Sequence, residues 1–364
     1  MISFGMSEEQ ELVRDAMREF AADAIRPIAR DSDEAAEVPA DFLETAWTLG
    51  LTSTQIPERF GGAGEERSLV TNAILLEELA HGDASLAIAA VAPSLFANAV
   101  VDHGTDDQKQ ALLPLFCGES YATGAVALTE AGPLSDAARP RTEAEQKGEN
   151  FILSGRKTFV AMGDRASHFL VTACLGEDVA AFVVPRDAAG LTVTDVERKM
   201  GLHALPTTGI DLERVEVGPE ALLGGPEGAD VQAILNASRV GLATVMLGMS
   251  RAVLEYCVPY TKDRVAFDEP ISKKQSIAFR LAEMHVEQHA LRQLVWQGAS
   301  LLEHDEDATK AAWQARSYAA EKSMWIADNG VQILGGHGFI REHPVEMWFR
   351  NARTLGVMEG LVCL

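Results

Sequence analysis

Cysteine is scarce in this chain of 364 residues, which has only four. They stand at Cys117, Cys174, Cys257 and Cys363, and no two have the two-residue spacing that zinc sites and redox centres use. A small disulfide-stapled scaffold also needs cysteines at a higher density. The cysteine content therefore predicts neither a disulfide framework nor a metal site.

Basic residues are also few, because 31 Lys and Arg face 54 Asp and Glu and leave a net charge of -23. A surface that binds nucleic acid needs a basic stripe against the phosphates, and the sequence contains no such stripe. We therefore exclude nucleic acid as a partner. A small anionic molecule remains compatible with the sequence where a few arginines gather.

Long apolar runs are missing as well. The richest stretch, residues 240–254, is interrupted by Arg251 and is too short to cross a bilayer. Residues 1–10 lack the basic start and apolar core of a signal peptide. The sequence predicts a cytoplasmic protein without membrane insertion.

Three common catalytic motifs are absent, namely GxGxxG after a strand, GxSxG and HExxH. The glycines at 336 and 338 are followed by Arg341 where the first motif needs a third glycine. His285 and His289 stand one helical turn apart, but Glu287 is not next to the first of them. Two solvent-facing histidines on a helix are the more common case, so no metal site is predicted here.

Hydrophobic periodicity divides the chain into three parts. Residues 1–120 have helical spacing, with clear helices predicted at 68–80 and 84–101, whereas residues 121–226 consist of short strand-like runs. Residues 227–364 return to helical spacing, and Pro259 should bend or end the first long helix. The predicted architecture is α+β: an N-terminal helical domain, a middle antiparallel β-barrel or sandwich, and a C-terminal helical bundle.

The second long helix of the bundle has a recognisable core face. Apolar residues recur in steps of three and four, and Gln288 occupies the one polar step among them. The apolar positions are Ile277, Leu281, Met284, Leu291 and Val295.

A single carboxylate stands in an apolar run near the end of the sequence. Glu359 lies between Met358 and Gly360, with Val357 and Leu361 close by. A carboxylate removed from water has a raised pKa and is useful as a base near neutral pH. Such a glutamate is more often paired or partly exposed, so the residues alone leave both interpretations open.

Several weak signals, in their order and spacing, resemble those of the acyl-CoA dehydrogenases. The resemblance covers nearly the whole chain and is specific only as a set. The motifs that carry it are Gly50-Leu51, Ile56-Pro57-Glu58, Leu128-Thr129-Glu130 with Ser135-Asp136, Gly155-Arg156-Lys157, Lys199-Met200-Gly201, Arg264 with Phe267 and Gln275, Gln332-Ile333-Leu334-Gly335-Gly336, Arg350-Asn351-Ala352-Arg353 and Glu359-Gly360.

The resemblance implies a four-helix bundle at the C-terminal end and FAD bound between the β domain and this bundle. It also implies a homotetramer or dimer in which the neighbour's Gln332–Gly336 loop contacts the adenine side of the flavin. The residues matched to cofactor-binding positions are Leu128, Thr129, Ser135, Phe159, Val160, Ala161, Arg264, Phe267, Gln275, Gln332, Gly335 and Gly336.

The implied reaction is α,β-dehydrogenation of an acyl-CoA thioester. By its place in the motif, Glu359 is similar to the family's base, which removes the α-proton while the β-hydride passes to FAD. Some relatives carry this base on the first bundle helix, where Ser238 stands here and cannot serve. An electron-transfer flavoprotein is the implied electron acceptor. The positions matched to substrate contacts are Ser135, Asn236, Arg239 and Gly360.

The sequence also departs from the family pattern. Ala161, Ala266 and Leu361 stand where a hydroxyl side chain is usual, and each missing hydrogen bond costs roughly 1 kcal/mol of cofactor binding. Three alternatives therefore stay open. They are an oxidase that reacts directly with oxygen, a dehydrogenase of carrier-protein-bound acyl groups, and a non-catalytic subunit that pairs with an active homologue.

Overall fold

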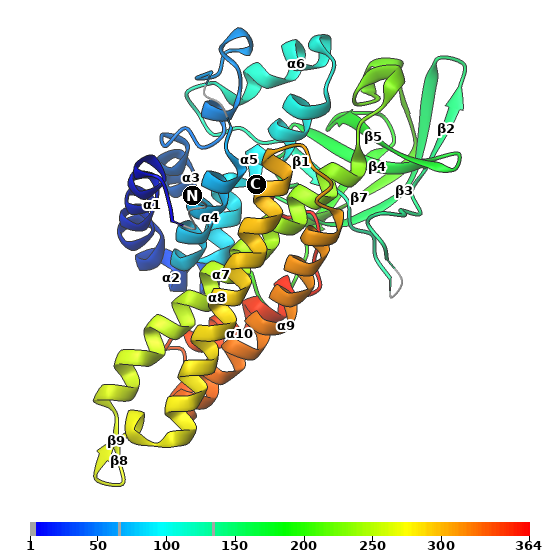
Figure 1. Ribbon diagram of the computed structural model, residues 1–364. Coiled ribbons are helices and arrows are strands. Elements are labelled where there is room, and N and C mark those ends of the chain that lie inside the picture. The colour runs from blue at the N-terminus through cyan, green and yellow to red at the C-terminus, as the bar shows by residue number, and fades with distance from the viewer. Residues whose placement is uncertain (1–4, 65–66, 133–134) are drawn as a thin grey trace.

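The chain forms three consecutive parts, as Figure 1 shows: helices, then a sheet, then a bundle of long helices that extends away from both. The structure is a computed structural model that describes residues 5–64, 67–132 and 135–364. The order of these parts agrees with the predicted α+β architecture.

The N-terminal part is helical, and side-chain caps fix where several helices begin. Ser7 and Gln10 form a reciprocal capping box at the first helix, and Asp83 accepts a hydrogen bond from the N–H of Leu86 at the fifth. The predicted helices at 68–80 and 84–101 are confirmed within two residues. The helices are α1 (Glu8–Phe20), α2 (Ala29–Ala35), α3 (Ala40–Trp47), α4 (Leu69–Gly82), α5 (Ala84–His103) and α6 (Asp106–Leu112).

The middle part is a seven-stranded sheet, as its alternating apolar runs predict. Its strands are β1 (Ala125–Ala127), β2 (Glu143–Lys147), β3 (Asn150–Ala161), β4 (His168–Leu175), β5 (Asp178–Pro185), β6 (Leu191–Val196) and β7 (Thr207–Val217). Most pairs are antiparallel, but β1 runs parallel to β4 and β2 meets β4 in parallel at one position. The sheet is therefore not wholly antiparallel, because β1 enters from the helical part and lies beside a strand distant in sequence.

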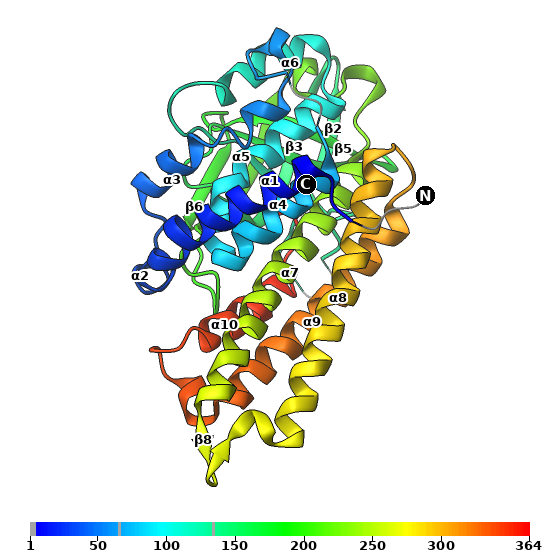
Figure 2. The same ribbon diagram turned by 60° about the vertical axis from the view of Figure 1, so that its left-hand side comes forward.

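The C-terminal part is a four-helix bundle with a small hairpin at its far tip, seen from a second side in Figure 2. Its elements are α7 (Val231–Asp263), β8 (Val265–Ala266), β9 (Glu269–Pro270), α8 (Gln275–Glu303), α9 (Thr309–Leu334) and α10 (Val345–Leu355). Pro259 lies inside α7, and the helix continues to Asp263, so the proline does not end it. Proline removes only one backbone donor, and α7 is held along its length by α8 and α9.

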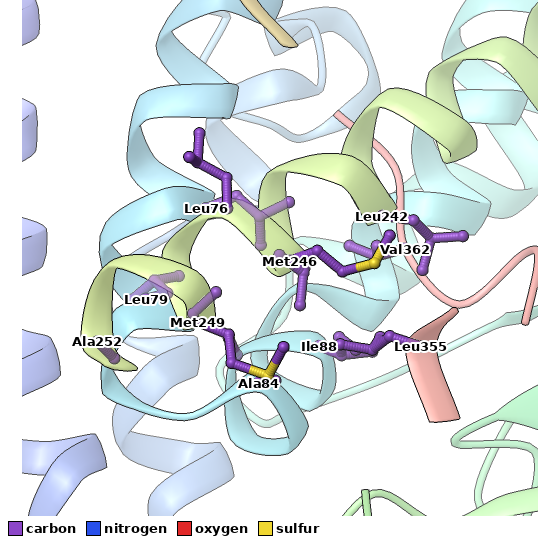
Figure 3. Packing of buried hydrophobic residues seen from close by; sticks show 14 of the residues in the cluster. Leu76, Leu79, Ala84, Ile88, Leu242, Met246, Met249, Ala252, Leu355 and Val362 are labelled. Atoms are coloured by element: carbon purple, nitrogen blue, oxygen red, sulfur yellow. The ribbon is translucent and has the colours of Figure 1, made fainter. Parts of the chain in front are cut away.

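The largest core joins the N-terminal helices to the bundle. Figure 3 shows Leu76 and Leu79 of α4, Ala84 and Ile88 of α5, and Met246 of α7 packed together. Two helices, α5 and α7, are long and apolar enough to cross a membrane, but 94% and 89% of their most apolar windows are buried inside this protein. Their apolar surface is satisfied by the core, as expected for core helices.

Candidate active site

The site is centred on Glu359, where the bundle meets the end of β1. After α10 ends at Leu355, the chain turns and brings the carbonyl oxygen of Glu359 within 2.9 Å of the Thr129 hydroxyl, which donates to it. Gly360 has a φ of +73°, and a Cβ placed there would lie 3.1 Å from the Cβ of Leu128. Only glycine combines this backbone conformation with such close approach. The structure therefore brings together four of the predicted residues, two from the middle part of the chain and two from its C-terminal end.

Two arginines from different helices face the carboxylate of Glu359. The Nε of Arg239, on α7, lies 3.4 Å from each carboxylate oxygen and donates a hydrogen bond to Oε1. The Nε of Arg316, on α9, lies 4.0 Å from Oε1. Both arginines are buried, and the guanidinium of Arg239 also stacks over the Trp313 ring at 4.8 Å.

The carboxylate of Glu359 is not fully satisfied by these contacts. Its side chain is 20% exposed, yet Oε2 is shielded and accepts no hydrogen bond from the residues that the structure describes. Within the same residues the N–H of Glu359 has no acceptor either. A shielded acceptor beside a free donor suits a ligand that presents both a proton and an oxygen atom.

The end of β3 supplies the next group of predicted residues. Phe159 has a φ of +55° and lies in a register shift of the β3–β7 pairing, where its N–H donates to the Glu197 carboxylate at 3.1 Å. Val160 and Ala161 follow and are buried. Ser135 lies nearer β1, on an exposed loop, where its hydroxyl accepts from the N–H of Glu130. The bulge redirects the end of β3.

A second group of predicted cofactor residues lies at the opposite end of the bundle, at the hairpin and the end of α9 (Figures 1 and 2). The group consists of Arg264, Phe267, Gln275, Gln332, Gly335 and Gly336. Phe267 is 89% exposed, and a Cβ at Gly335 or Gly336 would have no atom within 4 Å. Arg264 follows Arg239 by 25 residues, which is about 37 Å along a helix. Within one chain the structure does not bring the two groups together.

Asn236, a predicted substrate contact, is only 4% exposed and its amide is already used within the chain. It accepts from Gln232 at 2.8 Å and donates to Thr309 at 3.1 Å. It also lines a cavity of about 620 Å³ together with His103 and Asp307. Its role toward a substrate stays a prediction.

Sequence reasoning missed Arg316, Trp313 and Glu197. Only Arg316 left a signal, since it is a charged residue within the buried alanine face of α9. The contacts of all three depend on elements far away in the sequence. The residues present have the chemistry that FAD binding requires. The apolar end of β1 lies beside Glu359, and the exposed ring of Phe267 and the open glycines Gly335 and Gly336 lie at the far tip of the bundle. Ala161 leaves one side-chain donor missing.

Comparison with known proteins covers the whole chain. Three family models match in succession: the acyl-CoA dehydrogenase N-terminal domain over residues 7–120, the middle domain over 125–215 and the C-terminal domain over 228–361. An acyl-CoA dehydrogenase from Bacillus subtilis is 34% identical over 364 residues, which is 98% of this chain and 95% of the relative.

Two further comparisons agree. The short-chain specific mitochondrial acyl-CoA dehydrogenase of Bos taurus is 33% identical over 98% of this chain and 88% of the relative. The structure of butyryl-CoA dehydrogenase from Megasphaera elsdenii superposes with a TM-score of 0.89 at 30% identity, over 99% of this chain and 96% of that one. The predicted resemblance, cofactor and enzyme class are thereby confirmed. The chain belongs to the acyl-CoA dehydrogenase family, and it is an FAD-dependent oxidoreductase that acts on the CH–CH group of an acyl-CoA.

Proposed function

We propose that Glu359 removes the α-proton of an acyl-CoA thioester bound where β1, β3 and the bundle meet. The observation that supports this most directly is the shielded Oε2, which has no hydrogen-bond donor among the described residues although Oε1 is held by Arg239. Oε1 accepts from Arg239, whereas Oε2 lies 3.4 Å from the same Nε without a hydrogen bond and can accept a proton. Bound FAD supplies the acceptor for the hydride.

The backbone of the same residue has a second task in this proposal. The α C–H of a thioester is too weak an acid for a carboxylate unless the carbonyl oxygen is polarised by donors. No described residue accepts a hydrogen bond from the N–H of Glu359, and the Thr129 hydroxyl holds the carbonyl oxygen of Glu359 on the side of β1. Base and polarising donor therefore sit on one residue, whose backbone is fixed by Thr129 and by the left-handed turn at Gly360.

We infer further that the acyl group is short. Leu355 and Val362 lie on either side of Glu359 in the sequence. They are fully buried in the core of Figure 3, together with Ile88, Leu242 and Met246. A long acyl chain would have to displace several of them, at a cost of 1–3 kcal/mol or more. The relatives named for short-chain and butyryl substrates support the same inference.

The test is a series of acyl-CoA thioesters of rising length, added without oxygen to the purified holoenzyme. Butyryl-CoA should bleach the visible flavin absorbance fastest, and octanoyl-CoA should be at least about tenfold slower, since one methylene is worth a factor of ten or more in a tight pocket. Met246→Ala should reduce the ratio of the bleaching rate with butyryl-CoA to that with octanoyl-CoA. Met249→Ala, a matched truncation one turn away, should leave this ratio unchanged. Faster bleaching by octanoyl-CoA would contradict the short-chain inference.

The electron acceptor belongs to the same proposal. An electron-transfer flavoprotein fits a dehydrogenase whose reduced flavin is slow to react with oxygen. Rapid reoxidation of the bleached protein in air would instead favour the oxidase alternative. If no acyl-CoA bleaches the flavin, a carrier-protein-bound acyl group becomes the substrate to try. We also propose that the protein is located in the cytoplasm.

We also propose a homo-oligomer, a dimer or tetramer, in which FAD lies between the tip of one bundle and the β3 end of another copy. The support is the separation of the two groups of cofactor residues within one chain. Apolar side chains are exposed around the tip as well: Phe267 at 89%, Phe279 at 62% and Phe339 at 74%. Such a cluster is typical of a surface that another chain covers.

Phe267→Asp tests the oligomer. The charge should weaken association and lower the FAD content together, because both depend on the same tip. Sedimentation velocity and the ratio of flavin to protein absorbance measure the two effects. Leu12→Asp, at a position 73% exposed on α1, serves as the control and should change neither. A monomer that keeps its full FAD content would overturn the proposed arrangement.

A further inference from the structure

Arg316 is a buried cation that the role proposed for Glu359 does not by itself require. It lies on α9 with 5% exposure, on a face otherwise made of alanines at 312, 315 and 319, all fully buried. Burial lowers the pKa of this arginine, and the nearby charge of Glu359 acts in the opposite direction. A buried charge destabilises the fold unless its hydrogen bonds and ion pairs offset the lost hydration free energy.

Within the described residues, the hydrogen bonds of Arg316 go to the turn that leads into Glu359. One nitrogen, Nη2, donates to the carbonyl of Leu355 at 3.0 Å and to that of Met358 at 2.6 Å. Leu355 is the last residue of α10, and its carbonyl also accepts from the N–H of Met358 at 3.3 Å. A single guanidinium therefore ties the end of α10 to the residue directly before Glu359.

Another donor of this guanidinium, the Nε–H group, faces the carboxylate. The Nε of Arg316 lies 4.0 Å from Oε1 of Glu359 and has no hydrogen-bond partner within the described residues. Arg239 approaches the same carboxylate from α7. Two cations thus face one carboxylate. Arg239 contacts only the side chain of Glu359, whereas Arg316 faces this side chain and also binds the backbone that precedes it.

We propose that Arg316 is a positioning residue of the dehydrogenation reaction. It fixes the turn from Leu355 to Met358, so that Glu359 presents Oε2 and its N–H in one geometry. The inference rests on the role proposed for Glu359. Lysine offers a charge without the planar fork, so it can keep the electrostatic part and only some of the backbone contacts.

The test compares Arg316→Gln and Arg316→Lys with Arg353→Gln, an exposed arginine on α10 that serves as the matched control. The measurement is the rate of flavin reduction by butyryl-CoA without oxygen, together with the substrate dissociation constant. The flavin of Arg316→Gln should be reduced about 10–100-fold more slowly, with FAD content and substrate dissociation constant within about threefold of wild type.

Arg316→Lys should recover part of the rate. If Arg316→Gln does not fold, Arg316→Lys alone decides, and a wild-type rate in that variant overturns the proposal. Equal losses of rate in both variants would also overturn it, since a merely structural role predicts that result. Flavin reduction that persists in Glu359→Gln would refute the base itself, whereas an inactive Glu359→Gln beside a fully active Arg316→Gln refutes only the role of Arg316.

Discussion

Replacing Glu359 with glutamine should leave FAD bound and slow flavin reduction by acyl-CoA about 10²–10⁴-fold, the usual contribution of a positioned general base. Glutamine has nearly the same shape, and its amide oxygen can still accept from Arg239, which now donates to Oε1 at 3.4 Å. The backbone contact with Thr129 is independent of the side chain. The variant therefore removes the proton acceptor and leaves the fold and the carbonyl-polarising N–H in place.

Anaerobic mixing of the holoenzyme with butyryl-CoA, followed by visible absorbance, measures this effect. Glu321→Gln is the control, because its side chain is 74% exposed on α9, and it should reduce at the wild-type rate. Substrate binding to Glu359→Gln, measured by the perturbation of the flavin spectrum, should stay within about tenfold of wild type. Undiminished bleaching would remove Glu359 from the reaction and leave the site without its base.

The second large effect concerns stability and comes from Glu130→Gln. Glu130 lies at the end of β1 and accepts from the Nζ of Lys157 at 2.9 Å, from the N–H of Arg141 at 2.7 Å and from the N–H of Thr142 at 2.8 Å. Lys157 is fully buried, and Glu130 is 8% exposed. Without the carboxylate, the ammonium group of Lys157 stays buried without a counter-ion, which should cost about 3–5 kcal/mol of unfolding free energy.

Urea denaturation of wild type and of Glu130→Gln measures this loss of unfolding free energy. The double variant Glu130→Gln with Lys157→Met should recover much of the loss, because it removes both charges together. A double variant no more stable than Glu130→Gln alone would show that the unpaired charge is not the cause.

The pH dependence of the same pair has a definite sign. Burial raises the pKa of Glu130, but the Thr142 hydroxyl, the charge of Lys157 and the backbone donors outweigh it and bring the pKa down to about 2. A carboxyl group whose pKa is lower in the folded protein stabilises the fold above its usual pKa of 4.5 and loses that contribution as the pH falls toward 2. The advantage of wild type over Glu130→Gln should therefore be complete at pH 7 and shrink below pH 4.5. An advantage that stays constant down to the acid transition would contradict this assignment.

The sequence alone determined the local elements and their order. Of the core face predicted on α8, Met284, Leu291 and Val295 are fully buried, with Gln288 buried among them. The other two predicted positions, Ile277 and Leu281, are only partly buried against the same core. Spacing of this kind follows from the helix repeat and from the need to remove apolar side chains from water, and both operate over neighbouring residues. The apolar run around Glu359 marked that residue for the same reason.

Only the tertiary structure decided what surrounds Glu359. Thr129 precedes it by 230 residues and Arg239 by 120, and no local pattern specifies that they meet. The parallel pairing of β1 with β4 and the continuation of α7 through Pro259 were settled by packing as well. A periodic pattern records which side of an element is buried, whereas the partner on that side depends on how all the elements pack at once.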